Sequence, residues 1–328
     1  MTHTYTIFVL LPVYNGARYL SEQIDSILSQ QWSGDRCDDV RVVILCRDDV
    51  SSDGSPALLR NYAQRYPDII RLVHDDAGNL GAAGNFSALM HHAIGEAVSP
   101  PGFQPSGQPG RQSYFALADQ DDIWHADKLQ RSITALLAAE DGDTQTPVLV
   151  HSDLCVVDAG VNPIADSFMA YQGLRPARAS LSAQLLSNTL TGCTAMMNLA
   201  LLRRALPIPA AAVMHDWWLS LIASAFGRRV YLDETLVDYR QHDSNTIGAR
   251  SYTKSALSRE FIRELFKTRQ SPDTQKAFED IAAQADAFFR CHGHEMSAAQ
   301  RFIGRRIIAL PRASLWWQRL LFRLLRLL

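Results

Sequence analysis

The chain has 328 residues, of which 47% are hydrophobic and 20% are charged, and its formal net charge is −2. This composition excludes disordered, collagen-like and low-complexity chains, and the small net charge argues against a nucleic-acid-binding protein. The length suits one large α/β domain or two smaller ones.

The cysteines and the N-terminus bear on location. The five cysteines are Cys37, Cys46, Cys155, Cys193 and Cys291. Without C-x-x-C spacing, they are expected to be reduced, buried thiols rather than disulfides or a zinc site. The N-terminal segment lacks the basic start and small-residue cleavage site of a signal peptide, and no apolar run reaches the roughly 18 residues of a membrane span. We therefore expect a cytoplasmic protein without a transmembrane helix.

The first 118 residues alternate between strand and helix patterns. Residues 6–13 are a continuous apolar run ending in PVYNG, which predicts a buried parallel strand that enters a loop. The other predicted elements are strands at 40–46, 69–73 and 114–118, helices at 17–30, 57–66 and 85–97, and a Pro- and Gly-rich loop at 99–112. This order indicates a parallel sheet with helices on both faces, in which ligands bind beyond the carboxyl ends of the strands.

The rest of the chain is mixed and then helical. The predicted elements are strands at 148–153, 194–197, 230–232 and 236–239, and helices at 181–187, 215–226, 257–266 and 274–289. We divide the chain into a domain over 1–250 and a helical C-terminal region over 251–328.

The C-terminal segment differs from the rest in charge. No acidic residue follows Glu295, whereas arginines continue to the end: Arg301, Arg305, Arg306, Arg312, Arg319, Arg323 and Arg326. From Pro311 onward the arginines fall on one stripe of a helix, and leucines with Trp316 cover much of the remainder. Such a helix is typical of an anionic membrane interface, with packing against the domain or another subunit as the alternative.

Acidic residues gather where predicted strands end. Asp119 and Asp121, in DQDD, lie on the same side of an extended chain and can hold one Mg²⁺ or Mn²⁺ that keeps positions free for phosphate oxygens. The alternative is a solvated turn. Asp122 is expected to cap the following helix or to support the pair.

The order of the motifs narrows these alternatives. PVYNG, DDVSSDGS, GNLGAAGNF and DQDD resemble the family-2 glycosyltransferases of the GT-A fold. TGCTAMMN, HDWW and YRQHDSNTIG resemble the rhamnosyltransferase-like branch of that family. The resemblance covers about residues 5–250. It implies a Rossmann-like, mostly parallel sheet flanked by helices, followed here by the helical C-terminal extension.

The resemblance also implies site residues. The donor would be bound by Pro12, Tyr14, Asn15, Asp49, Asn79, Asn85, Asp119 and Gln120. Asp49 would accept from the base or ribose, while Asp48 orients its loop, and Val50 stands where the family usually has glycine. The metal would be held by Asp121, Asp119 and His242.

Asp216 is implied as the general base, with a helix cap as the alternative role. The implied acceptor contacts are Trp217, Trp218 and Arg240, with a core position as the alternative for one tryptophan.

The implied activity is inverting, metal-dependent transfer of a sugar, with L-rhamnose from dTDP-L-rhamnose as the expected donor. The implied acceptor is a lipid-linked glycan precursor of O-antigen or capsule, on the inner face of the plasma membrane. The alternatives are another hexose from a UDP-sugar, or an inactive nucleotide-sugar-binding subunit. A nucleotidyltransferase would need a Gly-rich, basic loop after the first strand, and PVYNGARYL is not one.

Overall fold

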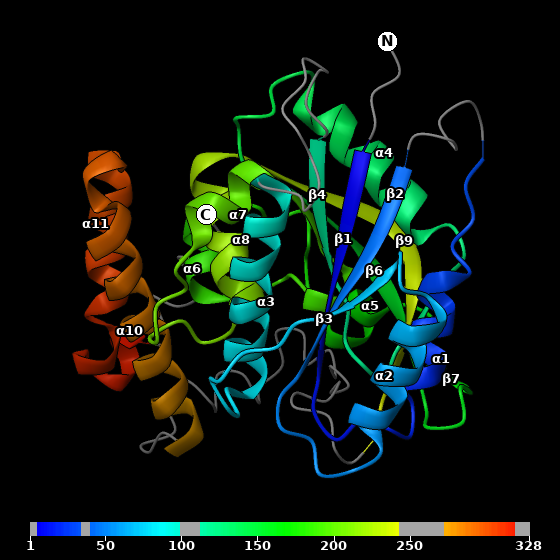
Figure 1. Cartoon of the computed structure of the whole chain (residues 1–328). Coiled ribbons are helices and arrows are strands. Elements are labelled where there is room, and N and C mark those ends of the chain that lie inside the picture. The colour runs from blue at the N-terminus through cyan, green and yellow to red at the C-terminus, as the bar shows by residue number, and fades with distance from the viewer. Residues whose placement is uncertain (1–4, 34–39, 99–111, 243–271, 319–328) are drawn as a thin grey trace.

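The computed structural model describes residues 5–33, 40–98, 112–242 and 272–318 (Figure 1). The described strands form one sheet in the order β3-β2-β1-β4-β8-β6-β9-β5, with β7 paired to β6. Among the described residues, no helix is long and apolar enough to cross a membrane.

The first half forms the predicted parallel unit. Its elements are β1 (Tyr5–Val13), α1 (Leu20–Leu28), β2 (Val40–Asp48), α2 (Ser55–Arg65), β3 (Ile70–Leu72), α3 (Gly81–Val98) and β4 (Gln112–Leu117). β1 pairs in parallel with both β2 and β4, and β2 pairs in parallel with β3. The carboxyl ends of these strands therefore meet at one edge of the sheet, as the sequence predicts.

The second half extends the sheet with both strand directions. Its elements are β5 (Ile123–Trp124), α4 (Lys128–Glu140), β6 (Val148–Val157), β7 (Pro163–Ala165), α5 (Phe168–Gln172), α6 (Leu181–Leu186), η2 (Gly192–Thr194), β8 (Met196–Asn198), α7 (Leu199–Ala205), α8 (His215–Phe226) and β9 (Arg228–Arg240). β8 runs antiparallel between β4 and β6, so β6 and its parallel neighbour β9 point the same way as β1.

One expectation is wrong here. The segments 230–232 and 236–239 are not two short strands but parts of the single strand β9. Its register against β6 shifts beside Asp153, and this irregularity accommodates the polar residues between the two apolar stretches.

Alternating side chains of β1 pack into two apolar layers, one on each face of the sheet. Ile7, Val9 and Leu11 pack with α1, α2 and α4 on one face of the sheet, whereas Phe8 and Leu10 pack with α3, α6, α7 and α8 on the other. Figure 1 shows these helices on the two sides of the strands. Because both faces are covered, β1 is apolar along nearly its whole length.

The C-terminal helices continue the second layer. They comprise α10 (Pro272–His292), η3 (Gly293–Glu295), α11 (Ala298–Ile308) and η4 (Leu310–Arg312). The ring of Phe288 packs edge-on against Trp218 at 5.6 Å, and Ile307 and Leu310 are fully buried in the same cluster. Residues 243–271, which include the predicted helix at 257–266, lie outside the described residues, as do residues 319–328 of the predicted tail helix.

Candidate active site

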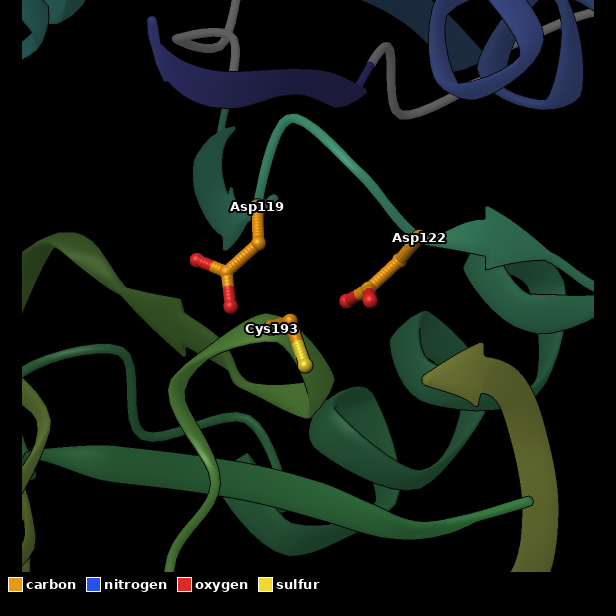
Figure 2. A group of neighbouring side chains, drawn as sticks. All are labelled: Asp119, Asp122 and Cys193. Atoms are coloured by element: carbon orange, nitrogen blue, oxygen red, sulfur yellow. The ribbon is translucent and has the colours of Figure 1, made fainter. Parts of the chain in front are cut away.

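Carboxylates converge where β4 ends. Asp119 and Asp122 lie at the two ends of the loop between β4 and β5, and the Cys193 thiol approaches both (Figure 2). One ligand atom from each of these three residues lies within 4.8 Å of the others. Burial raises the pKa of the Cys193 thiol well above its ordinary value, and the two carboxylates add to this effect. Cys193 is therefore a protonated thiol, buried as expected, that donates to the carboxylates.

Asp121, in this loop, contacts His242. The His242 Nε2 atom lies 2.9 Å from Asp121 Oδ2, although 121 residues separate them in sequence. The His242 ring packs against Tyr19 at 4.9 Å. Burial raises the pKa of Asp121, while His242 acts in the opposite direction. The structure thus brings together two of the three predicted metal ligands.

Asp119, the third predicted ligand, lies close enough to Asp121 and Asp216 for their charges to affect it. Burial, together with the nearby carboxylates of Asp121 and Asp216, raises the pKa of Asp119 to about 7. Repulsion among buried carboxylates is relieved by a cation, and carboxylate with imidazole is a ligand set that Mn²⁺ and Mg²⁺ accept. A cation could relieve the repulsion here, and the assignment of Asp119, Asp121 and His242 as its ligands stays a prediction, because the ligand atoms that lie within 4.8 Å of one another are those of Asp119, Asp122 and Cys193.

Asp122 supports this loop and does not cap a helix. Its carboxylate is fully buried and accepts from the Arg240 backbone N–H at 3.2 Å, whereas α4 begins after Asp127. Nearby, Lys128 is buried with its Nζ 3.8 Å from the Trp124 ring and no hydrogen-bond partner among the described residues. Burial lowers the pKa of Lys128 to about 8. Sequence reasoning missed Lys128, because a lysine at the start of an amphipathic helix gives no sign that it is buried.

Arg240 also serves the loop, which corrects its predicted contact with an acceptor. Its side chain is 2% exposed, and its guanidinium donates to the carbonyls of Asp121 and Ala159 and to Glu22 Oε2. It also lies 4.5 Å from the centre of the Tyr19 ring. A buried side chain with these bonds fixes the position of Asp121 and is not open to a substrate.

The loops after β1 and β2 are interlocked. The Asn15 N–H donates to Ser51 Oγ at 2.8 Å, and the Ser52 N–H donates to Asn15 Oδ1 at 2.8 Å. Asn15 has a positive φ of 50°, a conformation that asparagine tolerates better than most residues. Beside it, the Tyr14 side chain is 51% exposed, and Pro12 is partly buried at the end of β1.

Gln120 joins this pair of loops to DQDD. Its side-chain Oε1 accepts from the Tyr14 N–H at 2.8 Å, and its Nε2 donates to the Tyr14 carbonyl at 3.0 Å. A Cβ at Gly16 would lie 2.4 Å from Gln120 Oε1, so a side chain at this position would displace the Gln120 amide from Tyr14. Gln120 was predicted to bind the donor. Its amide instead holds the backbone of Tyr14.

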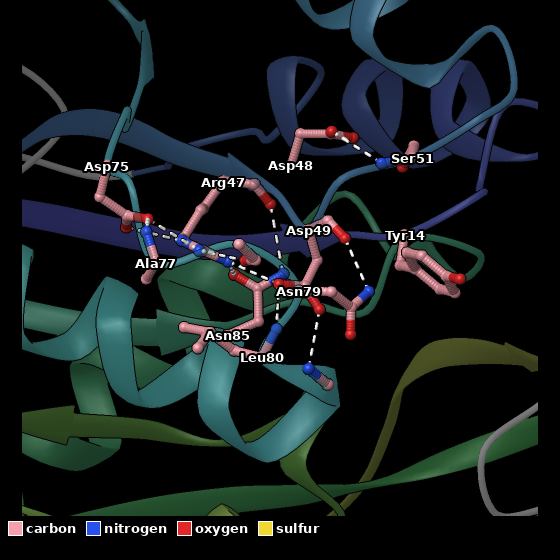
Figure 3. Close-up of polar contacts among 12 residues, drawn as sticks. Tyr14, Arg47, Asp48, Asp49, Ser51, Asp75, Ala77, Asn79, Leu80 and Asn85 are labelled. Carbon is pink, nitrogen blue, oxygen red and sulfur yellow. Dashed lines mark hydrogen bonds and ion pairs between the residues drawn. The ribbon is translucent and has the colours of Figure 1, made fainter.

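A buried arginine organises the loop after β2 (Figure 3). Arg47 is 3% exposed, and it donates to Asp75 Oδ1 and Oδ2 at 2.8 Å each and to Asp49 Oδ1 at 2.7 Å. The bidentate pair with Asp75 lowers the pKa of that carboxyl to about 2. Arg47 also donates to the Gly78 carbonyl and to Asn85 Oδ1, which ties β2 to the start of α3.

This network corrects the predicted roles of Asp49 and Asn85. Asp49 is 1% exposed, and its carboxylate accepts from Arg47 and from the backbone N–H groups of Leu80 and Gly81. Asn85 is 2% exposed and pairs with Arg47. Neither side chain is open to a nucleotide, because both anchor the N-terminus of α3.

The neighbours of Asp49 fix the loop. Asn79 Nδ2 donates to the Asp49 carbonyl at 2.8 Å, so this predicted donor contact also holds the loop. Asp48 Oδ2 accepts from the Ser51 N–H at 3.0 Å, which confirms that Asp48 orients the loop. Asp48 Oδ1 is enclosed without a partner among the described residues.

Asp216 lies in the first turn of α8, close enough to Asp119 for the two charges to interact. Burial raises its pKa to about 6, although backbone N–H groups stabilise the carboxylate. The preceding His215 is 4% exposed and stacks on Phe86 at 3.9 Å, and burial lowers its pKa to about 3. A Cβ at Gly192 would lie 3.2 Å from His215 Nε2 and 3.4 Å from Asp216 Cβ, so glycine admits both side chains.

The two tryptophans of HDWW differ. Trp218 is 1% exposed, and its indole N–H donates to the Ala205 carbonyl, so its predicted contact with an acceptor is wrong and it belongs to the core. Trp217 is partly exposed, and its indole N–H donates to the Gln184 carbonyl at 2.6 Å. Its contact with an acceptor stays a prediction.

Comparisons with known proteins bear on this site. A family model described as glycosyl transferase family 2 matches residues 8–197. The dTDP-rhamnosyl transferase RfbG of Shigella flexneri is 25% identical over 266 residues, which are 76% of this chain and 77% of that protein. An uncharacterized glycosyltransferase of Rickettsia typhi is 24% identical over 89% of this chain and 82% of its own length.

Solved structures show the same fold. The crystal structure of S. aureus TarS 1-349 in complex with UDP-GlcNAc aligns with a TM-score of 0.55 and 12% identity, over 93% of this chain and 70% of that chain. The sheet with its flanking helices is therefore that of the GT-A glycosyltransferases, with C-terminal helices added.

Proposed function

The chain belongs to glycosyl transferase family 2 and is a glycosyltransferase, and we propose that it transfers one sugar with inversion in a metal-dependent reaction. The observation that carries the proposal is the meeting of Asp119, Asp121, His242 and Asp216, from three separate parts of the chain, at the carboxyl edge of the sheet. This edge is where open α/β sheets bind ligands.

In this proposal Asp216 is the general base. It takes the proton from the attacking hydroxyl of the acceptor, and a pKa of about 6 leaves the carboxylate ionised at neutral pH while keeping its basicity. A single base without a second nucleophile gives one displacement and inverts the anomeric carbon. Asp216 also accepts from the Trp217 backbone N–H at 2.6 Å, which holds its carboxylate in place.

Asp121, Asp119 and His242 would hold Mg²⁺ or Mn²⁺ in this site. When bound, the metal stabilises the negative charge that develops on the leaving diphosphate. Arg240 and Asp122 position the loop that carries these ligands, and the Gln120 amide keeps that loop against Tyr14.

For the donor we propose dTDP-L-rhamnose. The support is the 25% identity with the dTDP-rhamnosyl transferase RfbG over three quarters of the chain. A UDP-hexose is the alternative donor. An inactive nucleotide-sugar-binding subunit is disfavoured because the proposed ligand Asp121 and the proposed base Asp216 are both present and close to Asp119.

For the acceptor we propose a lipid-linked precursor of O-antigen or capsule, reached from the inner face of the plasma membrane. The support is a surface of exposed aromatic and basic side chains on the C-terminal helices. Its members are Arg301, Phe302, Arg305, Arg306, Arg312, Trp316 and Trp317. Aromatic rings beside arginines suit the boundary of an anionic bilayer.

The test is sugar transfer from a panel of nucleotide sugars, with and without metal. We expect transfer from dTDP-L-rhamnose with Mg²⁺ or Mn²⁺, loss of transfer in EDTA, and weaker metal-dependent donor binding by Asp121→Asn. Full activity in EDTA would contradict the metal proposal, and transfer only from a UDP-sugar would contradict the donor proposal.

A further inference from the structure

Val50 has an unusual backbone conformation. Its φ is +66°, in the left-handed region, and valine is β-branched, so its side chain crowds the backbone there. Such a conformation is strained relative to an ordinary one, and glycine would adopt it without this strain. The sequence therefore retains a side chain at a position where the fold favours none.

Bonds on both sides of Val50 impose this conformation. Before it, the Asp49 N–H donates to the Val13 carbonyl at 2.7 Å, and the Asp49 carbonyl accepts from Asn79. After it, the Ser51 N–H donates to Asp48 Oδ2, and Ser51 Oγ accepts from the Asn15 N–H. The surrounding structure determines the turn, as it does at strained positions in functional sites.

The Val50 side chain contributes little to the core. It is 61% exposed, so packing does not offset the backbone cost. Strain without a packing benefit points to a contact that forms only with a ligand.

Tyr14 lies on the loop after β1, which is bonded to the loop that carries Val50. Val13 bonds to Asp49 on one side of this pair and Asn15 bonds to Ser51 on the other, so Tyr14 and Val50 occupy corresponding positions between them. Tyr14 is 51% exposed. The two joined loops thus each present an exposed apolar side chain, an aromatic ring and an isopropyl group, at the carboxyl edge of the sheet.

We propose that Val50 is a specificity residue that selects thymine over uracil, its methyl groups packing on the 5-methyl of the base beside Tyr14. This inference rests on the proposed function, since it assumes that the donor nucleotide binds at these loops. Thymine and uracil differ only in that methyl group, which an apolar neighbour favours and a glycine would leave partly in water. The strained valine would then serve the choice of a dTDP-sugar.

The experiment separates the base methyl from the sugar hydroxyl. Calorimetric titration of the full chain with dTDP and dUDP, in Mg²⁺, compares two ligands that differ only by the methyl group, and UDP against dUDP reports the 2′-hydroxyl. Burying one methyl group gives about a fourfold difference in affinity. We therefore expect dTDP to bind about fourfold more tightly than dUDP.

Two variants localise the effect. Val50→Gly is expected to bring the ratio of dTDP to dUDP affinity close to one, to leave dUDP affinity within about twofold, and to keep or raise the melting temperature. Val50→Ala, which keeps a Cβ in the strained turn, is expected to fall between. Leu80→Ala is the control, because Leu80 is also an exposed apolar residue, at 39% exposure, but lies in the loop directly before α3, and it should keep the preference for dTDP.

A wild-type ratio of one, or a ratio that Val50→Gly leaves unchanged, overturns the inference. These outcomes differ from failure of the proposed function, in which none of the three nucleotides binds.

Discussion

Asp216 is the residue on which the proposed chemistry depends most directly. It is the second residue of α8, after the N-cap Met214, and its Oδ1 accepts from the Trp217 backbone N–H, a bond that the amide oxygen of asparagine can also accept. Asp216→Asn therefore keeps the size of the side chain and removes its ability to take a proton. We expect transfer to fall roughly 10²-fold or more, with near-normal donor affinity and melting temperature.

The measurement is initial transfer rate alongside calorimetric donor binding. Asp127→Asn is the matched control, because Asp127 precedes the first turn of α4 and binds only Arg131 in the described structure. That variant should transfer sugar like the wild type. If Asp216→Asn also keeps its rate, Asp216 has a structural role and another residue is the base.

For single residues, the sequence predicted the location of the candidate active site better than it predicted the role of each side chain. Asp121, His242 and Asp216 were expected near one another, and the structure places them around the DQDD loop. Asp49 and Gln120 lie at the carboxyl edge of the sheet, as predicted. Their side chains bond to Arg47 and to Tyr14, however, rather than being free to bind a donor. The residue type of a carboxylate or amide does not reveal which donor it takes. The missed signal was Arg47, a cation inside a buried strand beside two aspartates.

The pair of Arg47 and Asp75 connects β2 to the loop before α3, so its strength sets how firmly that loop is held. Arg47 lowers the folded-state pKa of Asp75 to about 2, below the ordinary value near 4. The stabilisation is therefore present above about pH 4 and is lost as pH falls from 4 through 2. Asp75 is about one-third exposed, so solvent screening limits the contribution to about 1 kcal/mol.

We expect Asp75→Asn to lower the free energy of unfolding by about 1 kcal/mol at pH 7 and to flatten its decline between pH 4 and 2. Urea unfolding across this pH range measures both. Asp68→Asn, at an exposed position in the turn before β3, is the control and should follow the wild-type curve. A wild-type pH dependence in Asp75→Asn would rule out this pair as its source.

At the level of elements, local pattern predicted the strands that are buried on both faces. β1, β2 and β4 appear as apolar runs because helices cover both faces of the sheet. β9 was missed as one strand because its register shift beside Asp153 depends on β6, which no local pattern reveals. The two-residue strand β5 was not predicted, because it exists only through its pairing with β9.

The packing of α10 on α11 depends on Gly304. A Cβ there would lie 2.2 Å from the Phe289 ring, so alanine forces the ring or the helix to move. We expect Gly304→Ala to lower stability by about 1–3 kcal/mol, as overpacking does. Gly95→Ala is a matched control, because Gly95 lies within α3 with open space around its Cβ position.

The control should change stability in the opposite direction, raising it by about 0.5–1 kcal/mol through helix propensity. Thermal and urea unfolding of the two variants provide the comparison. Equal or higher stability of Gly304→Ala would show that the two helices do not need this close approach.

For the whole molecule, the basic and exposed aromatic residues after Glu295 stand out from the rest of the chain. α10 and α11 form the outer layer beyond α6 and α8 (Figure 1). Phe302, Trp316 and Trp317 are 59%, 51% and 50% exposed there, and no acidic residue follows Glu295 in the sequence. The segment after Glu295 is therefore basic and aromatic although the chain as a whole has a net charge of −2, and we propose that this segment faces an anionic surface.

Shortening the chain after Gln318 tests this proposal and keeps all the buried residues that the structure describes. Leu310 and Gln318 are 0% and 2% exposed, so the cut leaves them in place while Arg319, Arg323 and Arg326 are lost. Each arginine near an anionic bilayer contributes about 1 kcal/mol, so three correspond to about a hundredfold in partitioning.

We expect the shortened chain to keep its melting temperature and donor affinity and to bind phosphatidylglycerol vesicles about a hundredfold more weakly in a flotation assay. Raised salt should release the full-length chain from the same vesicles, because screening weakens charge attraction. Phosphatidylcholine vesicles are the control and should bind both chains weakly. Equal binding of the two chains to anionic vesicles would contradict the membrane assignment. A shortened chain that unfolds would instead show that its last ten residues pack on the protein, which was the alternative role of the tail.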